Sequence, residues 1–277
     1  MSEPVVIPPG AGEVVGDAPD RRVEILSGHE SLNATWSRFG PRRDGAELHV
    51  HREHTDLFYV IAGELVVRLG VDDTPVTVTA GTLARVPPLV VHGFRSGKTE
   101  VRYLNLHAPG REFARYLRAM RDGRPFSYDQ HPPPADGGRP VSDAAIGEAE
   151  LAADRPGLRM ALIADVDEIG IAEVRSDPGG AAAPAHVHRR HAESFYVLEG
   201  ELVLTVDDRE HRAPAGTWAQ IPAGAAHTFA VLGDAPARFL DVHTPSCGFG
   251  SFARALHRAE THEELAEARV AFDHELA

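Results

Sequence analysis

The length, composition and charge of the chain exclude several classes of protein. It has 277 residues, of which 43% are hydrophobic and 25% are charged, the balance of an ordinary folded protein rather than of a disordered or fibrous one. Lysine and arginine number 28 against 41 aspartate and glutamate, which gives a net charge of −13. This charge disfavours nucleic acid and anionic membrane surfaces as partners.

The location of the protein is predicted from what the sequence lacks. Its one cysteine, Cys247, has no partner for an internal disulfide. The first ten residues show neither the basic start nor the apolar run of a secretory signal, and no apolar stretch reaches the roughly 20 residues of a membrane-spanning helix. We therefore expect a soluble, cytoplasmic protein.

In chain order, residues 1–20 come first and are rich in proline and glycine. They are expected to be disordered, or to reach across to the other barrel or to another chain. The first half then contains short segments rich in β-branched and aromatic residues, such as 57–62, 64–69 and 76–81, separated by turn residues. This pattern is typical of an all-β sandwich or barrel. Residues 112–120 have apolar positions at helical spacing and predict a helix.

The second half repeats the first. HVHREHTDLFYVIAGELVV from His49 returns as HVHRRHAESFYVLEGELVL from His186, and GTLARVPPLVVHGF from Gly81 returns as GTWAQIPAGAAHTF from Gly216. Copies of this length are too long for a solenoid repeat. The halves are joined by a stretch rich in Pro, Gly and Asp. We predict a first domain over 1–128 with its barrel at about 20–110 and then a helix, a linker over 129–142, and a second domain over 143–277 with its barrel at about 145–246 and then helices.

Histidines and carboxylates recur at fixed spacing in both halves. In the second half the pattern G-x5-H-x-H-x4-E-x6-G is followed by G-x5-P-x-G-x2-H. Its members are Gly180, His186, His188, Glu193 and Gly200, then Gly216, Pro222, Gly224 and His227. The first half matches with His49, His51, Asp56 and Gly63, then Gly81, Pro87 and His92.

These motifs resemble those of the cupin superfamily, and the resemblance covers nearly all of both halves. It implies two tandem jelly-roll β-barrels, each with a metal site. The first half departs from the pattern in three ways. Asp56 stands for the usual glutamate, Leu89 for a glycine, and the upstream glycine is displaced to Gly40 or Gly45. Val231 replaces the final asparagine in the second half.

Strand geometry explains the spacing, because residues two apart on a strand point to one face. His49 and His51 therefore face one way, as do His186 and His188. Three imidazoles and one carboxylate suit a divalent transition metal such as Fe, Ni, Cu, Mn, Co or Zn, with positions left open for substrate. We predict one metal per domain, and we expect the departures at Asp56 and Leu89 to weaken the first site.

Strand alternation also predicts what surrounds each metal. Phe58 and Phe195 share a face with the carboxylates, and Phe94 and Phe229 lie two residues beyond the last histidines. These four are candidates for a substrate pocket or for barrel packing. Two further pairs of histidines recur in the halves. His107 and His243 are expected near the barrel mouth, making a structural hydrogen bond or transferring protons, and His54 and His191 in exposed turns.

Among cupins the chain looks most like quercetin-dioxygenase-like proteins. That resemblance implies a metal-dependent dioxygenase acting on a small phenol or enol, with Glu193 and Asp56 as general bases. The alternatives are redox-neutral isomerase, hydrolase or lyase chemistry, binding of a small molecule without turnover, and one active half beside a degenerate partner. Barrel pairing predicts either a monomer with pseudo-twofold halves or a homodimer.

Overall fold

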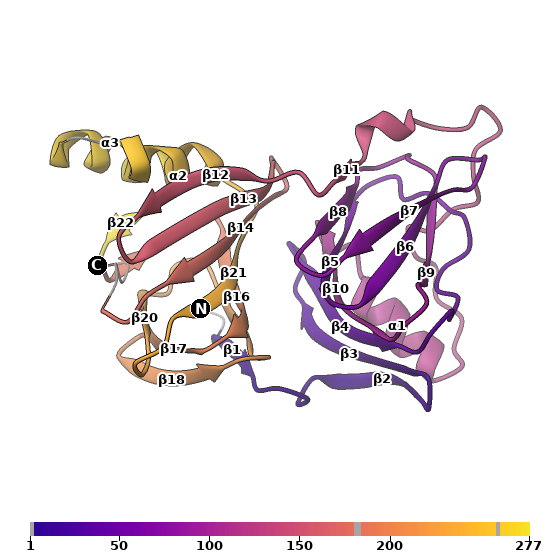
Figure 1. Cartoon of the computed structure of the whole chain (residues 1–277), viewed down its shortest axis with the longest axis horizontal. Coiled ribbons are helices and arrows are strands. Elements are labelled where there is room, and N and C mark those ends of the chain that lie inside the picture. Colours follow the sequence, from indigo (N-terminus) through magenta and orange to yellow (C-terminus); the bar gives the residue numbers. More distant parts are fainter. Residues whose placement is uncertain (1–2, 180–183, 259–260) are drawn as a thin grey trace. The chain divides into compact units, whose positions relative to one another are not determined.

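The structure, a computed structural model, describes residues 3–179, 184–258 and 261–277. Contacts divide it into two compact units, each built mainly of antiparallel strands (Figure 1). The first unit is Gly12–Glu148, and the second is Ala149–Ala277 together with Met1–Ala11. No helix of the described residues is long and apolar enough to cross a membrane.

The first unit contains a seven-stranded sheet in the order β11-β8-β5-β10-β4-β3-β2 and a three-stranded sheet in the order β7-β6-β9. The larger sheet is formed by β2 (Glu13–Ala18), β3 (Arg21–Gly28), β4 (Asn33–Phe39), β5 (Thr55–Ala62), β8 (Leu83–Val86), β10 (Val101–Ala108) and β11 (Ala145–Ile146). The smaller is formed by β6 (Glu64–Leu69), β7 (Thr74–Thr79) and β9 (His92–Ser96), and α1 (Phe113–Arg121) packs against β2, β3 and β4. This is the predicted jelly-roll domain with its helix.

The second unit repeats the arrangement with sheets in the orders β1-β19-β16-β21-β14-β13-β12 and β18-β17-β20-β15-β22. The first consists of β1 (Val5–Ile7), β12 (Glu150–Arg155), β13 (Leu158–Val166), β14 (Ile169–Ser176), β16 (Ala192–Glu199), β19 (Trp218–Ile221) and β21 (Ala237–Thr244). The second consists of β15 (His186–Val187), β17 (Glu201–Val206), β18 (Arg209–Pro214), β20 (His227–Val231) and β22 (Glu275–Leu276). The helices α2 (Phe249–Arg258) and α3 (His262–Phe272) follow.

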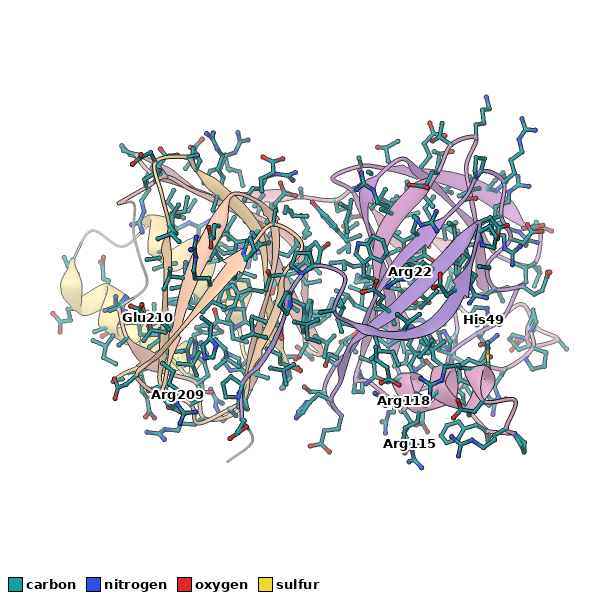
Figure 2. All side chains as sticks on the ribbon, turned by 90° about the horizontal axis from the view of Figure 1, so that it is seen from below. Arg22, His49, Arg115, Arg118, Arg209 and Glu210 are labelled. Carbon is teal, nitrogen blue, oxygen red and sulfur yellow. The ribbon has the colours of Figure 1, made fainter. Side chains whose placement is uncertain are left out.

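Side-chain alternation fixes which face of each strand is buried. Along β6 and β17 the same alternating burial recurs, with Leu65 and Val67 buried in one and Leu202 and Leu204 in the other. A period of two places every second side chain in the core. Arg209 and Glu210, labelled in Figure 2, are both exposed because β18 is the edge strand of its sheet.

Both large sheets are completed at one edge by a strand from a distant part of the chain. In the second unit β1 pairs with β19, so that Val5 lies opposite Gln220. In the first unit β11 pairs with β8, so that Ala145 lies opposite Arg85. The chain start, assigned to the first domain from the sequence, thus belongs by its contacts to the second unit, and Val5–Ile7 is ordered rather than disordered. The added strands cover backbone groups that would otherwise be unpaired.

The stretch 129–142, treated as a linker in the sequence, packs on the first unit. His131 exchanges backbone hydrogen bonds with Val50, and Arg139 donates its N–H to the carbonyl of Leu89. A 3-10 turn, Val141–Asp143, leads into β11. These bonds hold the segment beside the histidines that follow Val50.

Candidate metal centres

Four buried side chains meet in the first unit. The group consists of His49, His51, Asp56 and His92, and we call it the first centre. His49 and His51 precede β5, Asp56 is on β5, and His92 begins β9; His49 is labelled in Figure 2. One ligand atom of each lies within 4.8 Å of the others, and the Nε2 atoms of His49 and His51 are 3.2 Å apart. The structure thus brings all four predicted residues together.

The second centre is formed by His186, His188, Glu193 and His227, from β15, the segment after it, β16 and β20. One Glu193 oxygen, Oε2, lies 2.6 Å from His227 Nε2, 3.0 Å from His188 Nε2 and 3.5 Å from His186 Nε2. In the first centre the shorter Asp56 places Oδ2 3.3 Å from His92 Nε2 and 3.7 Å from His51 Nε2. The missing methylene gives a looser cluster.

Hydrogen bonds set the direction of every imidazole in both centres. Each Nδ1 contacts a backbone carbonyl: Glu47 for His49, Asp129 for His51, Val90 for His92, Pro184 for His186, Asp273 for His188 and Ala225 for His227. A carbonyl only accepts, so each Nδ1 carries the proton and each Nε2 turns its lone pair to the centre. This is the arrangement that orients histidine ligands for a metal.

The charges of the two centres suit a cation. Burial alone would raise the pKa of Asp56, but His107, His51 and His92 together hold it well below its ordinary value. The pKa of Glu193 is likewise lowered against the effect of burial, chiefly by His227. Burial and the neighbouring imidazoles lower the pKa of His49 to about 3. An ionised carboxylate with inward-facing imidazole nitrogens is a donor set that fits a divalent transition metal.

Two stretches of the sequence, 35–107 and 172–243, match the model of the cupin domain. Together they make up just over half of the chain, and one lies in each unit. The chain belongs to the cupin family. It carries two cupin domains, as predicted, and the two centres lie where the cupin motifs were found in the sequence.

Comparison with individual proteins supports the two-domain organisation of this cupin. It is 23% identical to quercetin 2,3-dioxygenase of Bacillus subtilis over 232 residues, which cover 69% of this chain and 67% of that one. Its structure resembles oxalate decarboxylase of Lactobacillus farciminis in a formate complex, with a TM-score of 0.61, 16% identity and coverage of 88% and 87% of the two chains. It also resembles Bacillus subtilis oxalate decarboxylase, whose Mn(II) centres have been studied, with a TM-score of 0.58, 18% identity and coverage of 81% and 73%. Structural likeness at such low identity supports the fold alone.

Behind the first centre lies a second layer of buried polar groups. His54 is buried, not exposed as predicted, because its Nδ1 donates to the Asp129 carboxylate at 2.9 Å. His107 Nδ1 lies 3.0 Å from His54 Nε2, and the Tyr128 hydroxyl is within 3.0 Å of both nitrogens. Asn105 donates its amide to Asp56 and accepts from His107 Nε2. The layer therefore connects the ligand carboxylate to Tyr128.

The second centre has a corresponding layer. His191, also predicted to be exposed, is buried and contacts the Asp273 carboxylate through Nδ1 at 3.2 Å. Its Nε2 lies 3.1 Å from His243 Nδ1, and His243 Nε2 lies 3.0 Å from Asp241, not aligned as a hydrogen bond. Both Asp129 and Asp273 also give a backbone carbonyl to a ligand histidine, and sequence reasoning missed both. The available signal was an aromatic residue followed by aspartate, YD at 128–129 after α1 and FD at 272–273 at the end of α3.

The layers differ at two linked positions. In the first, His107 Nε2 donates to Asn105, so its Nδ1 and His54 Nε2 are both acceptors, and the Tyr128 hydroxyl supplies a proton between them. In the second, burial and then Glu193 raise the pKa of Asp241, and the contact of its carboxyl with His243 Nε2 is not aligned as a hydrogen bond, so His243 Nε2 need not carry a proton. His243 Nδ1 can then donate to His191, and an apolar residue, Phe272, suffices where the first layer has Tyr128.

Each centre opens on a cavity. The cavity of the first measures about 230 Å³ and that of the second about 200 Å³. Phe94 lines the first and Phe229 the second. Phe58 and Phe195, also considered as pocket residues, are fully buried in the hydrophobic cores and do not line these cavities. Their strands point them past the carboxylates into the barrel interior.

The departures of the first motif have structural counterparts. Leu89 adopts a φ of +67°, close to the +89° of Gly224 at the matching position, so a leucine is held in a conformation that favours glycine. Both backbone N–H groups bond to the carbonyl of the second ligand histidine, His51 or His188, at 2.7 Å. Gly45 lies against the Phe94 ring with no room for a side chain. Gly180, its expected counterpart, lies outside the described residues.

Proposed function

We propose that this cupin is a metal-dependent oxygenase that acts on a small phenolic or enolic substrate. The observation that carries the proposal is the pairing of each buried cluster of three histidines and one carboxylate with an adjoining cavity that has aromatic residues in its lining. A closed structural metal site would need no such cavity. The likeness to a quercetin 2,3-dioxygenase supports the same reaction class.

The proposed ligands are the eight residues of the two centres: His49, His51, Asp56 and His92 in the first, and His186, His188, Glu193 and His227 in the second. A divalent metal bound there supplies Lewis acidity and free coordination positions for a substrate oxygen and dioxygen. Manganese is one candidate among Fe, Ni, Cu, Mn, Co and Zn, because a structurally similar oxalate decarboxylase has Mn(II) centres.

The carboxylates have a second proposed role. Asp56 and Glu193 are ionised and border the cavities, so each can accept the proton of a substrate hydroxyl. Asn105 donates its amide to Oδ1 of Asp56, the oxygen that points away from His51 and His92. Asp241 lies beside Glu193 at the matching position of the second domain. These neighbours fix the carboxylate and keep its other oxygen directed at the histidines.

The cavity volumes limit the size of the substrate. Pockets for drug-sized ligands measure about 300–1,000 Å³, and both cavities, at about 230 and 200 Å³, are smaller. A single aromatic ring or a short enol fits this volume better than a three-ring flavonol. The proposed substrates are therefore catechols, simple hydroxyaryl compounds and β-diketones.

A redox-neutral reaction is the second candidate. The structural neighbours include oxalate decarboxylases, which share the two-domain fold. The same ligands could support decarboxylation without net oxidation. The two candidates differ in oxygen consumption.

The test begins with metal analysis of anaerobically purified protein. We expect close to two equivalents in the intact chain and about one in His49→Ala or in His186→Ala, because each variant disables one centre. Oxygen uptake is then measured over catechols, hydroxyaryl compounds and β-diketones. Uptake that disappears in the ligand variants supports the oxygenase. Carbon dioxide release without oxygen uptake supports the second candidate, and a chain that binds no metal after reconstitution contradicts both.

A further inference from the structure

The cavity of the first centre contains a cation that the metal chemistry does not use. Arg21, on β3, lines this cavity together with His49, His51 and Asp56. Its Nε is buried without a hydrogen-bond partner, and its guanidinium lies over the Phe39 ring at 5.4 Å from the centroid. Among the residues that the structure describes, no carboxylate forms an ion pair with it. A buried donor left unpaired costs free energy, so a ligand that accepts from it is favoured.

The neighbouring arginine shows the contrast. Arg22, labelled in Figure 2, is next on β3 and points to the other face. There it pairs with Glu24 at 2.7 Å and with Asp17 at 3.3 Å. Its charge is neutralised within the domain. That of Arg21 is not, and it is directed at the cavity.

Hydroxyl groups accompany Arg21 on the cavity wall. Thr35 and Ser37 on β4 and Tyr103 on β10 line the same cavity. Burial raises the pKa of Tyr103, which keeps its hydroxyl protonated, while a hydrogen bond with Ser37 and then the nearby Arg21 charge oppose that rise. The wall therefore offers several hydrogen-bond donors beside one positive charge.

The second domain replaces this whole group by apolar residues. Strand register places Leu158 where Arg21 stands, Ala172 and Val174 where Thr35 and Ser37 stand, and Phe239 where Tyr103 stands. The second cavity has arginines of its own, Arg155 and Arg269, which come from β12 and α3. The Nε of Arg269 is also buried without a hydrogen-bond partner, but it reaches its cavity from a helix and not from the strand position of Arg21. Four coordinated differences at matching positions indicate different ligands rather than different packing.

The two carboxylates that line the first cavity, Asp44 and Asp56, do not neutralise the charge of Arg21. Asp44 also lines the cavity, but it is exposed and its charge acts on Arg68 of β6. Asp56 belongs to the metal cluster and is held by His92 and Asn105. Arg21 thus remains available.

We propose that Arg21 binds the carboxylate of the substrate in the first cavity, so that this domain selects small hydroxyaryl or enolic carboxylic acids over their neutral analogues. The guanidinium fork matches a carboxylate in two parallel hydrogen bonds. The hydroxyl of the same molecule would then face the histidines and Asp56. This inference rests on the proposed function only for the contact between the substrate hydroxyl and the metal centre. Binding of the carboxylate by Arg21 requires no turnover.

The test is anaerobic calorimetry of the metal-loaded full chain with 3,4-dihydroxybenzoate, its carboxamide and catechol. We expect the intact protein to bind the acid about tenfold or more tightly than either neutral compound. Arg21→Leu, which copies Leu158 of the second domain, should lose that preference. Arg38→Leu is the matched control, because Arg38 lies on β4 opposite Arg22 and pairs with Glu100 away from the cavity.

The outcomes separate this inference from the proposed function. Equal binding of acid and carboxamide by the intact chain overturns it, and this comparison requires no variant to fold. An acid preference that survives in Arg21→Leu, or that is lost equally in Arg38→Leu, overturns it too. If the preference follows Arg21 but no compound consumes oxygen, the oxygenase proposal fails and this one stands. If catechols consume oxygen but Arg21→Leu leaves the preference for the acid unchanged, the oxygenase proposal stands and the role of Arg21 is contradicted.

Discussion

The two centres use the same ligand chemistry but are supported differently. Both point three Nε2 atoms and one carboxylate inward. Behind them, Asn105 and Tyr128 in the first domain stand where Asp241 and Phe272 stand in the second. Asn105 accepts from His107, and this requires a hydroxyl at the far end of the layer. Asp241 accepts no hydrogen bond from His243, so the second layer does not require one. The residues at the two ends of each layer therefore match each other: together they allow every hydrogen bond in the layer to have one donor and one acceptor.

Acidification should have the largest effect, and it should affect both domains alike. Burial is the main cause that lowers the pKa of His54 to about 3 and that of His243 to about 3, and it lowers that of His107 as well. Unfolded histidines have a pKa of about 6.5. The unfolded chain therefore binds more protons, and stability is complete above pH about 6.5 and falls as the pH drops toward 3, by at most about 1.4 kcal/mol per histidine per pH unit.

Urea unfolding of the metal-free chain between pH 7.5 and pH 5 measures this loss. A single shared decline is expected, because each domain buries uncharged histidines in the same layer. Decline of one domain only, resolved by Trp36 fluorescence against that of Trp218, would show that the layers are not equivalent.

Replacing Asp129 or Asp273, the aspartates behind the two centres, should have the second largest effect on stability. Asp129 accepts from the backbone N–H groups of Arg52 and Glu53, and it also contacts His54 and His131. Asp273 accepts from one backbone N–H, that of Arg190, contacts His191, and forms an ion pair with the exposed Arg190 side chain at 3.4 Å. We expect Asp129→Ala to lower the free energy of unfolding by about 3 kcal/mol, and Asp273→Ala by about 2 kcal/mol.

Metal affinity should fall about 10- to 100-fold in the affected centre, because the carboxylate anchors the segment whose backbone carbonyl orients a ligand histidine. Denaturation and metal titration of the two variants check both effects. A larger loss in Asp273→Ala than in Asp129→Ala would contradict the order.

The linked positions can be tested with Tyr128→Phe. Removing the hydroxyl leaves His54 Nε2 and His107 Nδ1 facing each other at 3.0 Å without a proton between them. We expect a loss of about 2 kcal/mol. Adding Asn105→Asp, which copies the second domain, should restore part of it.

Tyr116→Phe is the control for this cycle. Tyr116 stacks on Tyr128 at 5.0 Å and lies near the same groups, so a small change there shows that the effect comes from the Tyr128 hydroxyl. Strictly additive effects of the two substitutions would contradict the coupling.

The smallest effect is expected at Leu89. A non-glycine residue at a φ of +67° is strained, and Leu89 is 38% exposed, so its side chain contributes little burial. Leu89→Gly should therefore raise the free energy of unfolding by about 1 kcal/mol. Gly224→Leu, the reverse change in the second domain, should lower it, and thermal melting of both variants measures the difference.

The sequence alone determined the two domains, the family and all eight proposed ligands. Their signal is local, because strand periodicity and short fixed spacings set which side chains share a face. His49 and His51 need only the strand direction, and His92 needs only its place after the proline motif. Repetition in the second half made each assignment stronger.

Tertiary structure alone decided the surroundings of those ligands. Asp129 lies beside His54, β1 completes the sheet of the second unit, and Arg21 reaches the cavity from a strand before the first motif. Each of these contacts joins residues far apart in the chain, between which no periodicity exists to be read. Whether a buried polar group is satisfied, and by which partner, depends on the neighbours that folding brings to it.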